Sequence, residues 1–141
     1  MRRLLPFLVM IGLMPCGVAM GQSAPPGFAF YSDVCYNSQG GDLLGTRIGV
    51  MKLRDAVYLF YQDAEGIFGE PQIIALPPHA LAGGKLSFTI ADFPDPSTFV
   101  GTISDRAIKV RLTNGGVGPK GTGVFNLKRE ALPEEGRFPA C

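Results

Sequence analysis

Turn-forming residues divide most of this chain into short segments, and the spacing of these turns constrains the fold more than any other feature of the sequence. Clusters such as Asn37–Gly41, Gly83-Gly84 and Pro94–Pro96 separate apolar segments of about six to ten residues, a spacing typical of all-β domains. Gly supplies positive φ angles in turns and Pro fixes a negative φ, so each cluster interrupts regular structure. The segments predicted to form strands are Phe28–Tyr36, Arg47–Leu53, Ala56–Gln62, Gln72–Leu76, Lys85–Ala91, Thr98–Ser104, Ala107–Thr113 and Thr122–Lys128.

Two of these segments show a clear two-residue period. Apolar residues alternate with Lys, Ser and Thr in Lys85–Ile90, and a similar alternation runs through Ala107–Leu112. This pattern is typical of antiparallel strands that bury one face and expose the other. Eight short strands joined by short turns predict a single all-β domain, either a small antiparallel β-sandwich or a small β-barrel.

Long helices have little room, because the chain contains 19 Gly and 12 Pro residues. Single helical turns are expected at Asp42–Leu44, at Pro77–Leu81 and at Glu130–Leu132, where Pro133 follows at once.

The N-terminus has the pattern of a secretory signal peptide. Arg2 and Arg3 precede an apolar run from Leu4 to Met20, and small residues follow. We expect cleavage near Gly21, which leaves a linker over residues 22–27 and a single domain over residues 28–141. The alternatives are a retained membrane anchor, for which the run is slightly short, and a lipoprotein modified at Cys16, for which Pro15 departs from the lipobox pattern. If the signal peptide is cleaved as expected, the mature chain has no stable membrane span.

Cysteine parity supports export. Removal of the signal peptide takes Cys16 with it and leaves Cys35 and Cys141 as an even pair, which is typical of proteins in oxidising compartments. We expect a structural disulfide between them, the alternative being two free thiols. The predicted location is therefore the periplasm or the extracellular medium.

The charge balance excludes some partners. The chain has 13 Lys and Arg residues against 12 Asp and Glu residues, and the predicted cleavage removes two of the arginines. A nucleic-acid-binding protein needs a basic surplus to neutralise phosphates, so no nucleic-acid partner is expected. On the same ground, an anionic membrane surface is not an obvious partner.

Catalytic and cofactor motifs are weak. Gly116–Gly121 matches the G-x-G-x-x-G string of dinucleotide sites, but a predicted strand follows it where such a site needs a helix, so we interpret it as a hairpin loop. His79 is the only histidine in the chain, so a Ser or Cys nucleophile would have no other imidazole as its base. One histidine and distant cysteines also do not form a recognisable set of zinc ligands. No cofactor, metal site or catalytic residue is predicted.

Carboxylates gather in two segments that are expected to be loops. Asp63, Glu65 and Glu70 lie in the first, and Asp92 and Asp95 lie in the second. Such residues can cleave a glycosidic bond or bind calcium when they are paired at the right distance. We interpret them as solvated turn residues.

The aromatic residues are the most suggestive candidates for a binding site. In Ala56–Gln62, Tyr58 and Phe60 share one face of the strand while Val57, Leu59 and Tyr61 share the other. Two apolar faces indicate a central strand, a ligand cavity or an interface. The candidate binding residues are Tyr31, Tyr36, Tyr58, Phe60 and Tyr61.

These observations favour a non-enzymatic exported β-domain that binds another macromolecule, such as an unidentified exported or envelope protein, and acts as an inhibitor, adaptor or envelope accessory. The alternative is a small barrel that carries an apolar or aromatic small molecule in its interior. A carboxylate-based hydrolase is the third hypothesis.

Overall fold

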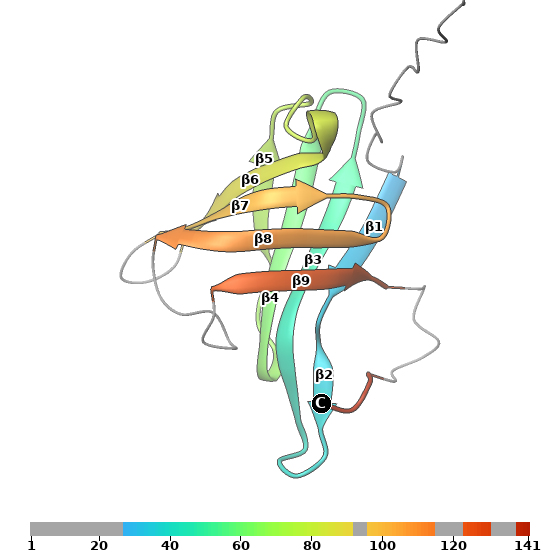
Figure 1. The fold of residues 1–141 in the computed structure, drawn as a ribbon, viewed down its shortest axis with the longest axis vertical. Helices are drawn as coiled ribbons and strands as arrows, with labels where there is room; N and C mark the ends of the chain where they lie inside the picture. Colours follow the sequence, from blue (N-terminus) through green and yellow to red (C-terminus); the bar gives the residue numbers. More distant parts are fainter. Residues whose placement is uncertain (1–26, 92–95, 115–122, 131–137) are drawn as a thin grey trace, which may run out of the picture.

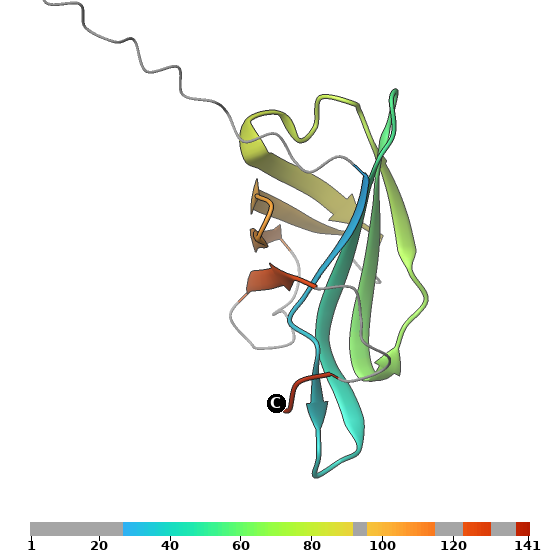
Figure 2. The same cartoon turned by 90° about the vertical axis from the view of Figure 1, so that its right-hand side faces the viewer.

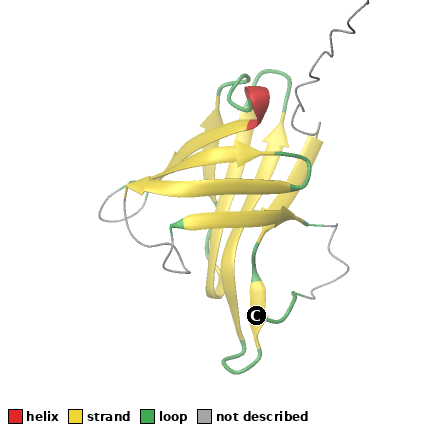
Figure 3. Ribbon diagram, viewed as in Figure 1, coloured by secondary structure: helices red, strands yellow, loops and turns green. Residues whose placement is uncertain are grey.

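The computed structural model describes residues 27–91, 96–114, 123–130 and 138–141, and this part of the chain is almost entirely β-structure (Figure 3). Its one helical element is the 3-10 turn η1 (Ala82–Gly84), just after the turn expected at Pro77–Leu81. No helix among these residues is long and apolar enough to cross a membrane. The strands are β1 (Gly27–Ser32), β2 (Cys35–Asn37), β3 (Asp42–Lys52), β4 (Val57–Phe68), β5 (Gln72–Leu76), β6 (Lys85–Ile90), β7 (Ser97–Ile103), β8 (Ala107–Asn114) and β9 (Val124–Arg129).

The strands form one nearly closed antiparallel barrel. The order of hydrogen-bonded neighbours is β5-β4-β3-β1-β9-β8-β7-β6, and β2 pairs with β3 outside this path. Strands therefore follow one another as a meander, and β9 returns to pair with β1 at Tyr31↔Arg129 and Ser32↔Lys128. The barrel remains open at a seam, where β5 and β6 lie close together without a ladder of hydrogen bonds. The all-β prediction is confirmed, and the architecture is the barrel.

Two layers of strands enclose the core. β1, β3, β4 and β5 form one layer and β6 to β9 form the other, as Figures 1 and 2 show from two directions. Burial alternates along β6, as its two-residue period predicts. Full burial of each large apolar side chain contributes about 1.5–3 kcal/mol to the stability of the folded state, relative to leaving that side chain exposed. The core residues are Ala29, Tyr31, Ile48, Val50, Val57, Leu59, Tyr61, Leu81, Leu86, Phe88, Ile90, Phe99, Ile103, Ile108, Val110, Phe125 and Leu127.

The first predicted strand is interrupted in its middle by a side chain. Asp33 and Val34 separate β1 from β2, although both strands pair with β3 in one continuous register. The carboxylate of Asp33 accepts a hydrogen bond of 2.8 Å from the backbone N–H of Thr46. This contact replaces a ladder bond, because a short acidic side chain competes well for nearby backbone donors.

β3 and β4 are longer than the sequence indicated. Asp42–Leu44 begins β3 instead of forming a helical turn, and β4 continues through the acidic segment that was expected to be a loop. The two strands pair without interruption from Leu43↔Gly66 to Lys52↔Val57. Pairing with β3 supplies backbone partners along the segment, and this outweighs its low local strand propensity.

The disulfide between Cys35 and Cys141 is present, with a Cα–Cα distance of 4.9 Å. It holds the end of the chain beside β2, where Tyr36 exchanges two backbone hydrogen bonds with the terminal segment. Its N–H donates to the Pro139 carbonyl at 2.7 Å, and its carbonyl accepts from the Cys141 N–H at 3.0 Å. The chain end is therefore part of the folded domain.

Candidate functional site: the outer aromatic face

The five aromatic residues predicted to bind a partner lie in three different environments. Tyr31 and Tyr61 point into the barrel and are 0% and 4% exposed. Tyr58 and Phe60 lie on the outside of β4 and are partly exposed. Tyr36 lies on β2, away from the other four, and is 42% exposed. The structure therefore brings only Tyr58 and Phe60 together on an accessible surface.

The two interior tyrosines are tied into the core. The Tyr31 hydroxyl donates a hydrogen bond of 3.0 Å to the Ser104 carbonyl, and burial raises the pKa of Tyr31, partly offset by the nearby Arg129 charge. The Tyr61 hydroxyl donates to Asp63 Oδ1 at 2.8 Å. The Tyr61 ring packs 5.6 Å from the ring of Phe99. These contacts give both side chains a structural role.

Tyr58 and Phe60 belong to a larger surface that we call the outer aromatic face. Strand register places its members side by side across four strands: Phe28 pairs with Met51, Met51 with Tyr58, and Phe60 with Ile73. Phe28 is 51% exposed and Ile73 is 63% exposed. The face consists of Phe28, Phe30, Met51, Tyr58, Phe60 and Ile73.

The rings of this face are held in a fixed arrangement. Phe28 packs edge-to-face against Phe30 at a centroid distance of 4.5 Å and against Phe60 at 5.8 Å. Gly49 on β3 lies between Phe30 and Phe60, and a Cβ at this position would come 2.9 Å from Cε1 of Phe30. The absence of a side chain at Gly49 thus lets the Phe30 ring lie over the strand. An ordered cluster loses little conformational entropy when it binds a partner.

A charged side chain borders the outer aromatic face on one side. The guanidinium of Arg47 lies 4.0 Å from the centre of the Phe30 ring and 5.5 Å from that of Phe68, which is cation–π geometry. Arg47 Nη2 also pairs with Glu130 Oε2 at 2.6 Å. None of the six residues of the face is charged, and the Arg47 charge at its border is paired with Glu130.

Sequence reasoning missed four members of this face, Phe28, Phe30, Met51 and Ile73, and it missed the role of Gly49. A signal was available for β3, because residues 48–51 are apolar or Gly on both faces, as residues 57–61 are. Two neighbouring strands with apolar residues on both faces indicate an apolar surface outside the core. Ile73 gives no such signal, because its outward direction depends on the pairing Phe60↔Ile73.

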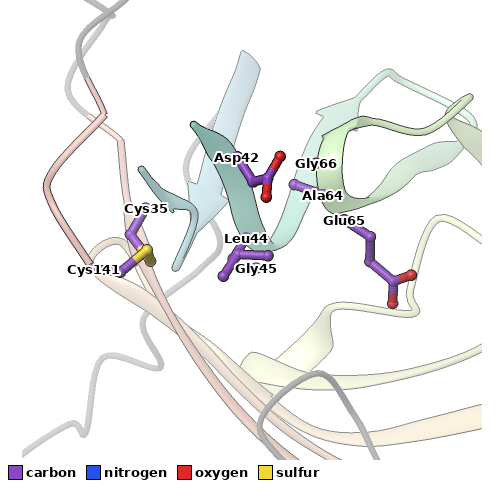
Figure 4. Close-up of a pocket in the computed structure, with 8 residues that line it drawn as sticks. All are labelled: Cys35, Asp42, Leu44, Gly45, Ala64, Glu65, Gly66 and Cys141. Atoms are coloured by element: carbon purple, nitrogen blue, oxygen red, sulfur yellow. A yellow bond between two sulfur atoms is a disulfide. The ribbon is translucent and has the colours of Figure 1, made fainter. Parts of the chain in front are cut away.

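A second candidate site is a pocket of about 560 Å³ beside the disulfide (Figure 4). Two carboxylates, those of Asp42 and Glu65, are among its lining residues, but Figure 4 shows them pointing in different directions. Paired carboxylate chemistry needs both groups to face one substrate. The lining residues are Cys35, Asp42, Leu44, Gly45, Ala64, Glu65, Gly66 and Cys141.

The other predicted acidic residues that the structure describes, Asp63 and Glu70, do not form a site either. Asp63 accepts hydrogen bonds from the hydroxyls of Thr46 at 3.1 Å and Tyr61 at 2.8 Å, and these bonds give its carboxylate a structural role. Glu70 and His79 are exposed in connecting segments. Within the described ranges, no group of three or more His, Cys, Asp or Glu side chains is arranged to hold a metal ion. Asp92, Asp95 and the string Gly116–Gly121 lie outside the residues that the structure describes.

A third hollow, of about 550 Å³, lies at the seam between β5 and β6. Its lining is mostly apolar, and it includes residues from both sides of the seam: Leu76, Pro77, Ala80, Lys85, Leu86, Ser87, Val100, Gly101 and Thr102.

Comparison with known proteins adds no homologue to this description: no protein-family model, no curated protein and no solved structure matches the chain.

Proposed function

We propose that this protein is a non-enzymatic exported domain that binds another protein through its outer aromatic face. One observation carries the proposal: six apolar side chains from four strands form one accessible surface that the core does not use, with Phe28 51% exposed and Ile73 63% exposed. Large exposed apolar patches on small domains are typical of interaction sites.

The composition of the face favours a protein partner with an apolar contact surface of its own. Phe, Tyr and Met are enriched at the centres of protein–protein interfaces, where charged residues are depleted. The face contains three Phe, one Tyr and one Met, and no charge. The fixed rings of Phe28, Phe30 and Phe60 resemble the rigid aromatic anchors that dominate binding energy in such interfaces.

Export is supported by the Cys35–Cys141 disulfide, because disulfides persist mainly in oxidising compartments. The N-terminal signal pattern supports it independently. The partner is therefore an exported or envelope protein.

The two other hypotheses have less support. A carrier needs a cavity in the barrel, yet the side chains of Leu59, Ile108 and Leu127 are 0% exposed and the rings of Phe88 and Phe99 stack at 4.9 Å. A hydrolase needs two facing carboxylates, and the pocket beside the disulfide does not supply them.

Site-specific photo-cross-linking tests the proposal. A photoreactive phenylalanine replaces Tyr58 in the full chain, which is expressed with its own N-terminal segment and irradiated in cells. The matched control carries the same group at Gln39, an exposed residue in the turn between β2 and β3 that lies outside the outer aromatic face. We expect a discrete adduct of higher mass from position 58 and none from position 39.

A second variant establishes the specificity of that adduct. Phe28→Ser combined with Ile73→Ser removes the two most exposed side chains of the face without entering the core, so the fold is retained and the adduct from position 58 is lost. An adduct of twice the chain mass would identify a second copy as the occupant and overturn the heterologous partner. Equal adducts from positions 58 and 39, or none from position 58, would overturn the proposal.

A further inference from the structure

The outward side chains of β6 to β9 form a second surface with a different character. They alternate with the buried residues of these strands, and those that the structure describes are Lys, Arg, Ser, Thr, Asn, Ala and Val, without a carboxylate. Figure 1 looks onto this layer, and no described strand lies in front of it. We call its exposed cations the basic face: Lys85, Lys109, Arg111 and Lys128.

Strand register places the four cations close together. Lys85 pairs with Thr102, and Thr102 pairs with Lys109, so these two lysines lie two strands apart, about 10 Å at the usual strand spacing. Arg111 lies two residues along β8 from Lys109, about 7 Å away. Lys128 is on the neighbouring strand, opposite Ala107. These separations are comparable to the Debye length of about 8 Å at physiological salt, so the four charges repel one another and act as a unit.

None of the four cations has an ion-pair partner among the described residues. Asp105 lies in the turn between β7 and β8, at the end of these strands, while Asp42, Asp55 and Glu65 lie on and between the strands of the other layer. A net charge close to zero thus averages over two differently charged sides. The near-zero net charge of the whole chain therefore does not exclude an anionic surface as the partner of this face.

We propose that the basic face docks the protein on a bilayer surface that carries anionic phospholipid headgroups. The cations come from three strands of the layer, β6, β8 and β9, and are spread in two dimensions. This spread matches a planar array of phosphates, whereas a linear polyanion is bound along a groove or stripe. Val100 and Val124 lie among the cations on β7 and β9 and are 38% and 61% exposed. Small exposed apolar groups beside Lys and Arg are suited to the headgroup layer.

This docking is independent of the outer aromatic face. The two layers enclose one core and turn their outer surfaces in opposite directions (Figure 2). A molecule docked through β6 to β9 therefore presents β1, β3, β4 and β5 to the aqueous phase, where a protein partner has access.

Sedimentation with lipid vesicles tests the inference. The full chain recovered from the exported fraction is mixed with phosphatidylcholine vesicles that contain or lack phosphatidylglycerol, at low and raised NaCl. We expect binding only to the anionic vesicles, and we expect raised salt to weaken it. Each basic residue near an anionic bilayer contributes about a fivefold gain in partitioning, so Lys109→Gln combined with Arg111→Gln lowers it about 25-fold.

Two further variants complete the design. Lys52→Gln with Arg54→Gln removes the same charge from exposed positions outside the basic face, and we expect binding close to wild type. Lys85→Gln with Lys128→Gln repeats the loss at the two remaining cations. No binding of the wild-type chain to anionic vesicles, equal loss in the control variant, or binding to soluble polyglutamate but not to vesicles would each overturn the proposal.

Discussion

Arg47 on β3 pairs with Glu130 just after β9, across a sequence separation of 83 residues and an Nη2–Oε2 distance of 2.6 Å. Both side chains are largely buried, at 18% and 16% exposure. Arg47 Nε and Glu130 Oε1 have no hydrogen-bond partner among the residues that the structure describes, so only one atom of each group is paired there. The ion pair links the two layers next to the β1–β9 junction.

Glu130→Ala leaves the Arg47 charge partly buried without its partner. We expect a loss of about 2 kcal/mol in the free energy of unfolding, measured by urea denaturation with an unchanged m-value. The double variant Arg47→Met with Glu130→Leu replaces both charges by apolar groups and is expected to lose less than the sum of the single changes. An additive double variant would show that the two side chains do not interact.

Replacing Cys35 and Cys141 by Ala releases the terminal segment from β2. The bridge closes a loop with a sequence separation of 106 residues, so its removal is expected to cost about 4–5 kcal/mol in the chain-entropy model. Thermal unfolding with and without a reducing agent measures this loss, and the Ala variant serves as the control that reductant leaves unchanged. Equal melting temperatures for the oxidised and reduced wild type would contradict the expectation.

Gly101→Ala tests the close approach of β7 to β8. A Cβ at Gly101 would overlap the carbonyl oxygen of Lys109 and come 2.7 Å from Cα of Val110, so backbone atoms have to move. We expect a loss of about 3 kcal/mol or more in the free energy of unfolding. Gly69→Ala is the matched control, because its Cβ meets only Asp63 O at 3.5 Å. Similar stabilities for the two variants would refute the close approach.

Tyr31 makes stability sensitive to alkaline pH. Its pKa is raised in the folded state, mainly by burial, so the stability that comes with the neutral form is fully present below the ordinary value of 10.0 and is lost as pH rises through the folded pKa. Tyr31→Phe removes the hydrogen bond to Ser104 and is expected to cost about 1 kcal/mol at neutral pH. The difference in the free energy of unfolding between wild type and variant is then expected to narrow above pH 10. Urea denaturation of both proteins at neutral pH and above pH 10 measures this difference. A constant gap would contradict the prediction.

Much of the barrel was predictable because local patterns and burial agree. The alternation in Lys85–Ile90 reappears as strict alternation of buried and exposed residues in β6. The glycine pairs Gly40-Gly41 and Gly83-Gly84 fall between strands. Parity of the cysteines sufficed for the disulfide. These features depend on near neighbours in sequence or on counting, and a sequence shows both directly.

What escaped prediction depends on pairing between distant segments. Asp63 and Glu65 read as turn residues, and only the partners of β4 on β3 make them part of a strand. Ile73 joins the outer aromatic face through its register with Phe60. The cations at Lys85 and Lys109 come together through two successive pairings. Register of this kind is set by the whole sheet, and no local pattern encodes it.

The open seam has a consequence for proteolysis. The connector between β5 and β6 crosses the junction at which the described strands form no ladder. A single cut at exposed Ala82 or Gly83 therefore breaks no hydrogen-bonded pairing between strands. Each of the two resulting pieces contains one complete layer, and the layers still pair through β1 and β9. Cys35 belongs to the first piece and Cys141 to the second, so the nicked protein keeps its covalent unity until the disulfide is reduced.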